Sequence, residues 1–326
     1  MRVVVTGATG FLGHHLVRAL LAEGHEVVAF ARLESRTASL EALGITVARG
    51  SLFDAGDRQR ILDGAEVVVH AAGGGMVGAR EDILRANTET TRALVEAAPN
   101  TLQHFVLISS LAAHGPSEPD RPAIESDPDR PQSAYGESKC LAEGIALAAR
   151  ARFRVTALRA PALYGPGEHR LLPLFRLARR GVIPMVHPEG TLSLLHGADC
   201  ARAVTRAIAA TEADSGVYYL AEPRRYRRSE MARLIAAAVG REARILPIPT
   251  LGIRAAGRAS EVWARLSGQP SPLSRDKVRD LVGRHQACDP TRAIHAFAWQ
   301  PAMAFREGAV ETYRDYLARG WLPPER

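Results

Sequence analysis

Lysine is nearly absent from this chain of 326 residues. Of its 42 basic residues only Lys139 and Lys277 are lysines, and the remainder are arginines. Arginine carries a permanently charged, rigid fork, whereas the compact ammonium of lysine takes part readily in proton chemistry. Where arginine is the default cation, a lysine is informative, and Lys139 is therefore a candidate functional residue.

Cysteine and long apolar runs are also scarce. The three cysteines, Cys140, Cys200 and Cys288, are widely spaced without a CxxC pattern, which excludes a disulfide framework and fits a reducing cytoplasm. No apolar run approaches the roughly 20 residues of a membrane span. The chain enters an apolar strand at once, so we expect no signal peptide, no integral membrane segment and a cytoplasmic protein.

Metal and nucleic-acid sites are not indicated either. No histidine has a partner at metal-ligand spacing, as judged at His70, His114 and His196, so no metal is expected. The net charge of +7 is dispersed along the chain. The densest basic run, at 224–228, precedes a helix expected from Ser229, and we interpret it as a solvated surface loop rather than a nucleic-acid site.

The order of apolar segments predicts an α/β fold. Strands are expected at 3–5, 26–31, 45–48, 67–71, 104–109 and 155–158, with helices between several of them, notably at 81–98 and 133–151. Continuously apolar strands alternating with helices indicate a doubly wound parallel Rossmann sheet. We expect a dinucleotide-binding domain over 1–165 and a smaller, mainly helical substrate lobe over 166–326, with 217–220 returning to the sheet.

A glycine loop joins the first strand to the first helix. The stretch "TGATGFLG" places Gly7, Gly10 and Gly13 where backbone can approach a pyrophosphate and a helix N-terminus supplies N–H groups. NAD enzymes usually carry a carboxylate at the end of the second strand, but here Ala31 is followed by Arg32, with Arg36 nearby. A guanidinium pairs with a 2′-phosphate, so NADP(H) is preferred and NAD(H) stays possible. The alternative is a solvent-facing arginine.

Tyr135 and Lys139 lie four residues apart on an expected helix and share one face. A free phenol ionises near pH 10, and a neighbouring ammonium stabilises the phenolate. The pair follows the glycine loop by about 125 residues, and Ser109–Ser110 ends the intervening strand. Acid–base chemistry beside a bound dinucleotide is the predicted use of this lysine.

At this point the chain resembles the extended short-chain dehydrogenase/reductase family over essentially its full length. The matching stretches are "TGATGFLG", "HAAG" at 70–73, "RANTETT", "ISSLAAHG" at 108–115, "YGESK" at 135–139 and "LRAPALYGPG" at 158–167. The resemblance implies that Ser110 hydrogen-bonds the reacting oxygen, Tyr135 transfers the proton and Lys139 assists it.

The same resemblance implies a set of cofactor contacts. They are Gly7, Thr9, Gly10, Phe11, Leu12, Arg32, Arg36, Ser51, Leu52, Ala71, Ala72, Gly73, Asn87, Tyr135, Lys139, Pro161 and Leu163. The chain departs from the family at the adenine contact, where it reads "GSLFD" with Ser51 in place of an aspartate. A homodimer paired through the helices near 81–98 and 133–151 is also implied.

Two further departures bear on the substrate. Sugar-nucleotide members of the family typically bind a diphosphate through an asparagine and an arginine, and these positions hold Ala162 and Leu192 here. Losing both polar groups favours a less polar substrate. The C-terminal stretch at 271–322 also resembles the branch that holds 3β-hydroxysteroid dehydrogenases and dihydroflavonol reductases.

A helical stripe at 251–266 consists of Leu251, Ala255, Ala259, Val262 and Leu266, with Arg254, Arg258 and Arg265 outside it. Ordinary packing on the substrate lobe is the first interpretation. A lid over an apolar substrate and a contact with a membrane surface are the alternatives.

Together these features predict an NADP(H)-dependent oxidoreductase that interconverts a secondary alcohol and a ketone on a largely apolar substrate. A sterol, a β-keto or β-hydroxy acid and a flavonoid-like ketone would each fit. Two alternatives remain open: a nucleotide-sugar epimerase or dehydratase with tightly bound dinucleotide, and a non-catalytic dinucleotide sensor.

Overall fold

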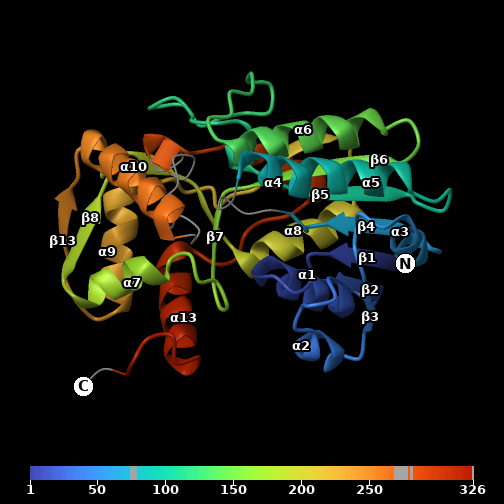
Figure 1. Cartoon of the computed structure of the whole chain (residues 1–326), viewed down its shortest axis with the longest axis horizontal. Coiled ribbons are helices and arrows are strands. Elements are labelled where there is room, and N and C mark those ends of the chain that lie inside the picture. Colours follow the sequence, from blue (N-terminus) through green and yellow to red (C-terminus); the bar gives the residue numbers. More distant parts are fainter. Residues whose placement is uncertain (74–78, 268–277, 280–281, 325–326) are drawn as a thin grey trace.

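A seven-stranded parallel sheet forms the centre of the computed structural model, which describes residues 1–73, 79–267, 278–279 and 282–324 (Figure 1). The strand order is β11-β6-β5-β4-β1-β2-β3, and every pairing is parallel. The strands are β1 (Arg2–Thr6), β2 (Glu26–Ala31), β3 (Thr46–Arg49), β4 (Val67–His70), β5 (His104–Ser110), β6 (Arg154–Ala160) and β11 (Gly216–Tyr219). The expected strands are therefore confirmed to within two residues.

Helices cover both faces of this sheet, which confirms the doubly wound fold. Side chains alternate along β1, so that Val3 and Val5 join one core cluster and Val4 joins the other. The first face is covered by α1 (Phe11–Ala22), α8 (Gly197–Ala209) and α12 (Thr291–Phe297), and the second by α3 (Ala55–Leu62), α5 (Thr90–Glu96) and α6 (Ala134–Ala148). Figure 1 shows α5 and α6 on one side of the sheet and α1 and α8 on the other.

The later part of the chain contributes to the sheet and to the helices on its first face. Strand β11 pairs with β6 through Val217↔Ala157 and Tyr218↔Leu158, so the expected return to the sheet takes place. Helix α8 also comes from beyond residue 165, and its Ala203 and Val204 pack in the same core cluster as Leu16 of α1. Together with α12, these elements show that at least three segments from the second half of the chain belong to the Rossmann layers.

A smaller lobe lies at the left of Figure 1. It contains α7 (Leu172–Arg179), α9 (Arg228–Ala238), α10 (Thr250–Ser267) and α13 (Phe305–Ala318). Short strand pairs accompany these helices: β8 (Val182–Met185) with β13 (Arg244–Pro247), β9 (Thr191–Leu192) with β12 (Tyr226–Arg227), and β7 (Ala162–Tyr164) with β10 (Leu194–His196). Its core is rich in aromatic side chains, including Tyr164, Phe175, Tyr226, Phe305 and Tyr316.

A buried carboxylate joins the segments of this lobe. Glu222 accepts hydrogen bonds from the hydroxyls of Tyr164 at 2.7 Å and Tyr226 at 2.6 Å, and from the Phe305 backbone N–H at 3.2 Å. A buried carboxylate is costly unless it is hydrogen-bonded, and here three donors satisfy it. Glu222 therefore fixes β7, β12 and the start of α13 relative to one another.

The helix expected at 81–98 is divided. It comprises α4 (Arg80–Leu84), a π-helical segment (Arg85–Glu89) and α5. Thr91 donates from Oγ1 to the Asn87 carbonyl at 2.7 Å, a local bond that accompanies the wider turn. Such π-helical turns concentrate at functional positions, and this one contains Asn87.

The arginine run at 224–228 is only partly a solvated loop. Arg224 pairs with Glu230 and Arg227 with Glu189, and both arginines are exposed. Arg228, in contrast, is only 9% exposed and donates to the carbonyls of Val186 and Gly283. The expectation of a fully solvated run was wrong at Arg228, which begins α9 and faces inward.

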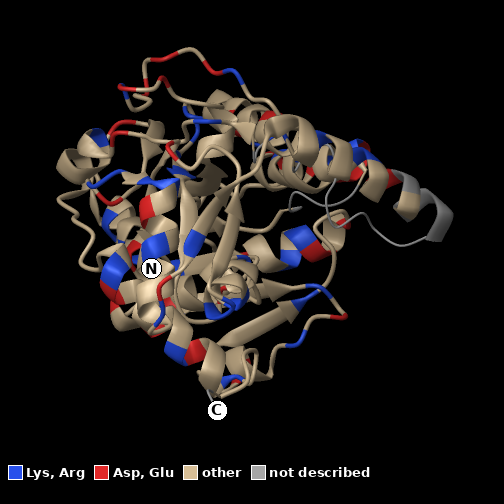
Figure 2. Cartoon of the chain, turned by 90° about the vertical axis from the view of Figure 1, so that its left-hand side faces the viewer, with Lys and Arg blue, Asp and Glu red and all other residues tan. Residues whose placement is uncertain are grey.

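Charged residues of both signs are interspersed along the elements seen in Figure 2. None of the described helices combines the length and the apolar character that crossing a membrane requires.

Candidate active site

The glycine loop packs so closely on itself and on the segment after β4 that side chains are excluded at Gly7 and Gly13. Gly7 has a φ of 72°, and a Cβ there would lie 2.6 Å from the Ala71 carbonyl carbon and the Ala72 nitrogen. A Cβ at Gly13 would lie 2.2 Å from the Gly7 oxygen. Gly10 is the N-cap of α1, and no side chain caps that helix. The loop therefore fits a dinucleotide pyrophosphate, which the N–H groups of the first helical turn would hold.

The floor beside this loop is built from β1 and β4. Ala71 N–H donates to the Thr6 carbonyl and Ala72 N–H to Thr6 Oγ1, both at 3.2 Å. Thr6 Oγ1 lies 2.7 Å from His70 Nδ1. Burial, followed by the charge of Lys139, lowers the pKa of His70 to about 3, so this imidazole is neutral near pH 7. His70 is a structural element of the floor.

The predicted loop residues differ in how they face the site. Thr9 and Gly10 lie at the bend, while Leu12 packs against the first core cluster. The Phe11 ring stands edge-on to His15, with centroids 5.0 Å apart, and approaches Gly197 of α8. The Phe11 side chain therefore packs against α8, and its backbone N–H is the part that belongs to the helix N-terminus.

The end of β2 carries the residues expected to select the cofactor. Arg32 is 78% exposed, and its Nε lies 3.2 Å from Glu34. Arg36 is exposed as well. Arg49, at the end of β3, donates to the carbonyls of Leu33 at 3.0 Å and Ser35 at 3.2 Å. Arg49 thereby fixes the loop that presents Arg32 and Arg36 to solvent, a role that sequence reasoning missed.

The turn after β3, where we expect the adenine to lie, is held by Asp57, an aspartate outside the family's motif position. Asp57 Oδ2 accepts from Ser51 N–H at 2.8 Å, and this bond and Arg60 lower the pKa of the Asp57 carboxyl. A Cβ at Gly50 would lie 2.2 Å from Asp57. Ser51 is exposed and Leu52 is buried, so the "GSLFD" turn presents a hydroxyl where the family has a carboxylate.

Tyr135, Lys139 and Ser110 are brought to the carboxyl end of β5. Ser133 caps α6 by accepting from Gly136 N–H at 3.1 Å, which places Tyr135 in the first helical turn. Lys139 is only 6% exposed, and its Nζ donates to the Ile108 carbonyl at 3.0 Å. Nζ also lies 5.9 Å from the centroid of the Tyr135 ring. Ser110, two residues beyond Ile108, accepts at Oγ from Ala112 N–H at 3.2 Å.

Asn87 and Gly73 adjoin this group. A Cβ on Gly73 would lie 2.2 Å from Asn87 Oδ1 and 3.4 Å from Lys139 Nζ. Asn87 Nδ2 donates to Ser138 Oγ and to the Ile83 carbonyl, both at 3.0 Å. The π-helical turn thus directs Asn87 toward α6, where it supports the helix that carries Tyr135 and Lys139.

A buried ionic network behind the site was not anticipated. Arg159 of β6 donates to both oxygens of Asp129, each at 2.7 Å, and to Glu143 Oε2 at 2.6 Å. Ser109 Oγ donates to the same Glu143. The only signal in the sequence was an arginine within the apolar strand pattern "VTALRA". The network holds β5, β6 and α6 together directly beneath Ser110.

The charges of this network are mutually stabilised. Burial raises the pKa of Asp129, but hydrogen bonds from His114 and Arg159 outweigh it and lower that pKa to about 2. Burial lowers the pKa of Arg159, while its bonds to Glu143 and Asp129 raise it by more. Asp129 and Arg159 therefore stay ionised near neutral pH.

The two substrate-side departures lie in different surroundings. Ala162 is exposed on β7, between the half-buried Pro161 and Leu163. Leu192 is 8% exposed and packs in the core of the smaller lobe. Ala162 therefore presents a methyl group to solvent. Leu192 stands where sugar-nucleotide members have an arginine, and its side chain is part of the core of the smaller lobe.

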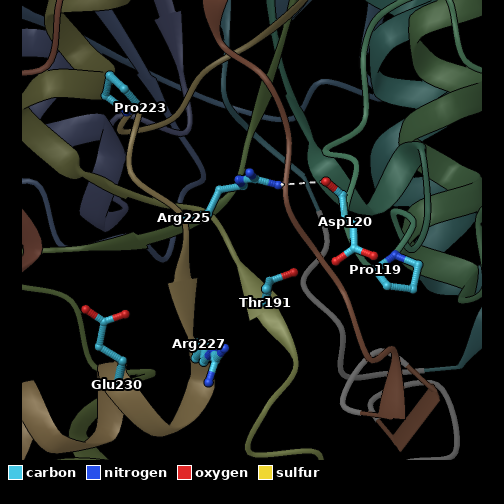
Figure 3. A pocket seen from close by; sticks show the side chains of 7 residues that line it. All are labelled: Pro119, Asp120, Thr191, Pro223, Arg225, Arg227 and Glu230. Atoms are coloured by element: carbon cyan, nitrogen blue, oxygen red, sulfur yellow. Dashed lines mark hydrogen bonds between the residues drawn. The ribbon is translucent and has the colours of Figure 1, made fainter.

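A separate hollow of about 500 Å³ lies between the smaller lobe and the segment at 119–120. Figure 3 shows Arg225 reaching across it to the Asp120 carbonyl, a distance of 3.4 Å. Its lining consists of Pro119, Asp120, Thr191, Pro223, Arg225, Arg227 and Glu230. Since none of Ser110, Tyr135 and Lys139 lines it, this hollow is distinct from the site at β5.

Within the part of the chain that the structure describes, no group of three or more His, Cys, Asp or Glu residues could hold a metal ion.

Known proteins resemble this chain along its length. Ceramide reductase of Caulobacter vibrioides is 33% identical over 326 residues, which cover 98% of this chain and 96% of that protein. The 2-alkyl-3-oxoalkanoate reductase of Stenotrophomonas maltophilia is 28% identical, over 94% of this chain and 97% of that protein. The dTDP-glucose 4,6-dehydratase of Streptomyces venezuelae superposes with a TM-score of 0.79 at 24% identity, over 99% of both chains, which shows the shared fold.

The family model described as the NAD dependent epimerase/dehydratase family matches residues 3–221, which include the glycine loop, Ser110, Tyr135 and Lys139. This agrees with the resemblance carried by the sequence motifs, and the chain belongs to the NAD-dependent epimerase/dehydratase family.

Proposed function

We propose that this protein is an NADP(H)-dependent oxidoreductase that interconverts a secondary alcohol and a ketone on a largely apolar substrate. The observation that carries the proposal is the meeting of Tyr135, Lys139 and Ser110 at the end of β5. The names of the relatives support it, since they include a ceramide reductase, a 2-alkyl-3-oxoalkanoate reductase and a ketoreductase of a farnesyl-bearing quinoline oxide from Stigmatella aurantiaca.

The chain's own residues supply the proton side of the reaction. A dinucleotide held at the glycine loop would supply the hydride side of the reaction. Ser110 Oγ donates a hydrogen bond to the substrate oxygen, and the Tyr135 hydroxyl gives that oxygen a proton as the carbonyl becomes an alcohol. Lys139 stabilises the phenolate that remains, with its ammonium held on the Ile108 carbonyl at 3.0 Å.

Substrate binding is assigned to the lobe formed mainly by residues 166–326, with residues 1–165 forming most of the dinucleotide-binding domain. Ligands of doubly wound sheets bind at the carboxyl ends of the strands, where Ser110 lies and where β7 leads into the lobe. The exposed methyl group of Ala162 next to Leu163 makes this entrance less polar than a diphosphate requires.

A nucleotide-sugar epimerase is the second candidate, because UDP-glucose 4-epimerase of Vibrio cholerae is 26% identical over 97% of this chain. The absence of polar side chains at Ala162 and Leu192 weighs against it, since a dianionic diphosphate needs donors or cations.

A panel of ketones assayed with NADPH and with NADH tests the proposal. We expect NADPH to be consumed faster with ketones bearing long alkyl or fused-ring groups than with short polar ones. A protein that keeps its dinucleotide through purification and interconverts UDP-sugars without net consumption would be an epimerase. Binding of NADPH without turnover of any ketone or alcohol would indicate a sensor.

The cofactor preference is tested at the end of β2. If Arg32 pairs with the 2′-phosphate, Arg32→Ala should weaken NADPH binding by about 1.5 kcal/mol, the lower end for a charged hydrogen bond because this site is exposed. The dissociation constant of NADPH would rise roughly tenfold, and that of NADH would barely change.

Glu34→Gln is the matched variant. It removes the carboxylate that lies 3.2 Å from Arg32 Nε and would repel a phosphate. We expect it to tighten NADPH binding and to leave NADH binding unchanged. Equal effects on both cofactors in either variant, or a wild-type preference for NADH, would contradict the assignment to NADP(H).

A homodimer in the cytoplasm completes the proposed picture. The outer face of α6 presents Leu141, which is 47% exposed, and Gly144, around which an added Cβ would meet no atom within 4 Å. We propose that a second copy of α6 packs on this side of the helix, where the missing side chain of Gly144 allows close approach. The sedimentation coefficient of the purified chain distinguishes dimer from monomer.

A further inference from the structure

We propose that helix α10 docks this protein on the surface of an anionic lipid bilayer. The helix covers Thr250–Ser267 in the smaller lobe. Its start is held in place, because Ile248 N–H donates to the Met185 carbonyl at 2.9 Å and Thr250 Oγ1 lies 3.2 Å from His187 Nε2. The described side chains beyond this anchor reveal which face meets the protein.

The face of α10 that packs on the protein is not the expected stripe. Gly257 is buried and Ile253 and Ser260 are partly buried, so these positions mark the inner face. Leu251 is 79% exposed, and Ala255 and Ala259 are exposed as well. For these three residues, ordinary packing was the wrong interpretation of the stripe; the structure does not describe the side chains of Val262 and Leu266.

The outer face continues at helical spacing into an aromatic residue. Leu251, Ala255, Ala259 and Trp263 follow one another at intervals of four residues and so share one side of the helix. Trp263 is 52% exposed. Side chains on this side lie opposite Gly257, so an apolar strip ending in tryptophan faces away from the protein. Tryptophan and leucine on the apolar side are typical of helices that lie in a bilayer interface.

The charges beside this strip select the partner. Arg254 and Arg258, one helical turn apart, are both exposed and flank Leu251. A guanidinium on a long stem reaches from an apolar strip to the phosphate layer, and its fork pairs with phosphate oxygens. With a net charge of +7, the protein is attracted to an anionic surface. A protein partner with an apolar surface would bind the strip without using Arg254 and Arg258, whereas an anionic bilayer would bind both the strip and the two arginines.

Neighbouring elements at the same end of the molecule also expose apolar side chains. Strand β13, which leads into α10, exposes Leu246 at 39%, and its partner β8 exposes Val182 at 37%. Arg244 of β13 is exposed, and acidic residues are present as well, with Glu242 beside β13 and Glu261 on α10. Figure 1 places β8, β13 and α10 at the same end of the molecule, away from α3. The docked surface would therefore consist of α10 and the edge of the β8–β13 pair.

Docking would bring the smaller lobe next to the bilayer, in which an apolar ketone dissolves. This route of substrate access rests on the proposed function. The docking itself rests only on α10. The two can therefore be tested apart.

The experiment measures partition of the wild-type chain onto vesicles of phosphatidylcholine with and without phosphatidylglycerol. We expect binding to the mixed vesicles, weakening as salt is raised, with a blue shift of tryptophan emission as Trp263 enters the interface. Leu251→Gln/Trp263→Gln should weaken partition about tenfold or more. Arg254→Gln/Arg258→Gln should weaken it by a similar factor for phosphatidylglycerol vesicles only.

Two matched variants act as controls for vesicle binding. Leu33→Gln replaces a leucine in the loop after β2, outside the smaller lobe, that is 72% exposed and so comparable to Leu251. Arg306→Gln/Arg314→Gln removes two exposed arginines from α13. Neither should change partition by more than about twofold, because effects at exposed sites outside the surface are small.

The proposal is overturned if wild type does not partition onto phosphatidylglycerol vesicles, or if the α10 variants bind them as wild type does. It is also overturned if the α10 variants change the sedimentation coefficient instead, since the strip would then join two copies of this chain. Turnover of a water-soluble ketone should be the same in all α10 variants, and only turnover of a vesicle-dissolved ketone should fall. Vesicle binding without any ketone turnover would reject the proposed function and leave docking intact.

Discussion

Tyr135→Phe is expected to lower turnover by roughly 10²–10⁴-fold while leaving the fold and dinucleotide affinity close to those of wild type. The substitution removes only the hydroxyl that would exchange a proton with the substrate oxygen, and a positioned acid or base contributes about this factor. The aromatic ring stays in the first turn of α6, half-buried near Lys139. The measurement is steady-state turnover with NADPH and a ketone, together with the dissociation constant of NADPH.

Tyr218→Phe is the matched control. It removes a hydroxyl that donates to the Asp214 carbonyl at 2.8 Å, on the edge strand of the sheet. We expect turnover near that of wild type. If Tyr135→Phe retained activity within a fewfold of wild type, the proton transfer would have to be assigned to another residue.

Lys139→Arg is expected to lose most activity although it conserves charge. Lys139 is 6% exposed, with Nζ on the Ile108 carbonyl and beneath Gly73, whose added Cβ would lie 3.4 Å away. A guanidinium is larger than an ammonium, and extra volume in a packed site displaces its neighbours. We expect the cation to leave its place beside Tyr135, and kcat to fall further than NADPH affinity.

Lys139→Met separates charge from shape. It nearly conserves the length of the side chain but removes the ammonium that stabilises the phenolate, so residual activity should be lower still and its pH–rate profile displaced to alkaline pH. Arg150→Lys serves as the control, because it makes the reverse exchange at an exposed position after α6. It should leave turnover and its pH profile unchanged. Wild-type turnover and pH profile in Lys139→Arg would show that this lysine is only a buried cation.

The sequence by itself determined the Rossmann sheet, the glycine loop and the Tyr135–Lys139 pair. These features are local: a strand follows from a short β-branched run, a loop from glycines at fixed spacing, and a shared helix face from an interval of four. The scarcity of lysine gave Lys139 its significance before any contact was known.

Only the tertiary structure decided which polar and apolar side chains are buried. It placed Arg159 among Asp129, Glu143 and Ser109, turned Arg228 inward, and inserted a π-helical turn at Asn87. It also left Leu251, Ala255 and Ala259 exposed, where periodicity alone favoured packing. Periodicity identifies the residues that share a face, but the direction of that face depends on which distant segments cover it. Those contacts join residues far apart in the chain, so the local pattern does not contain them.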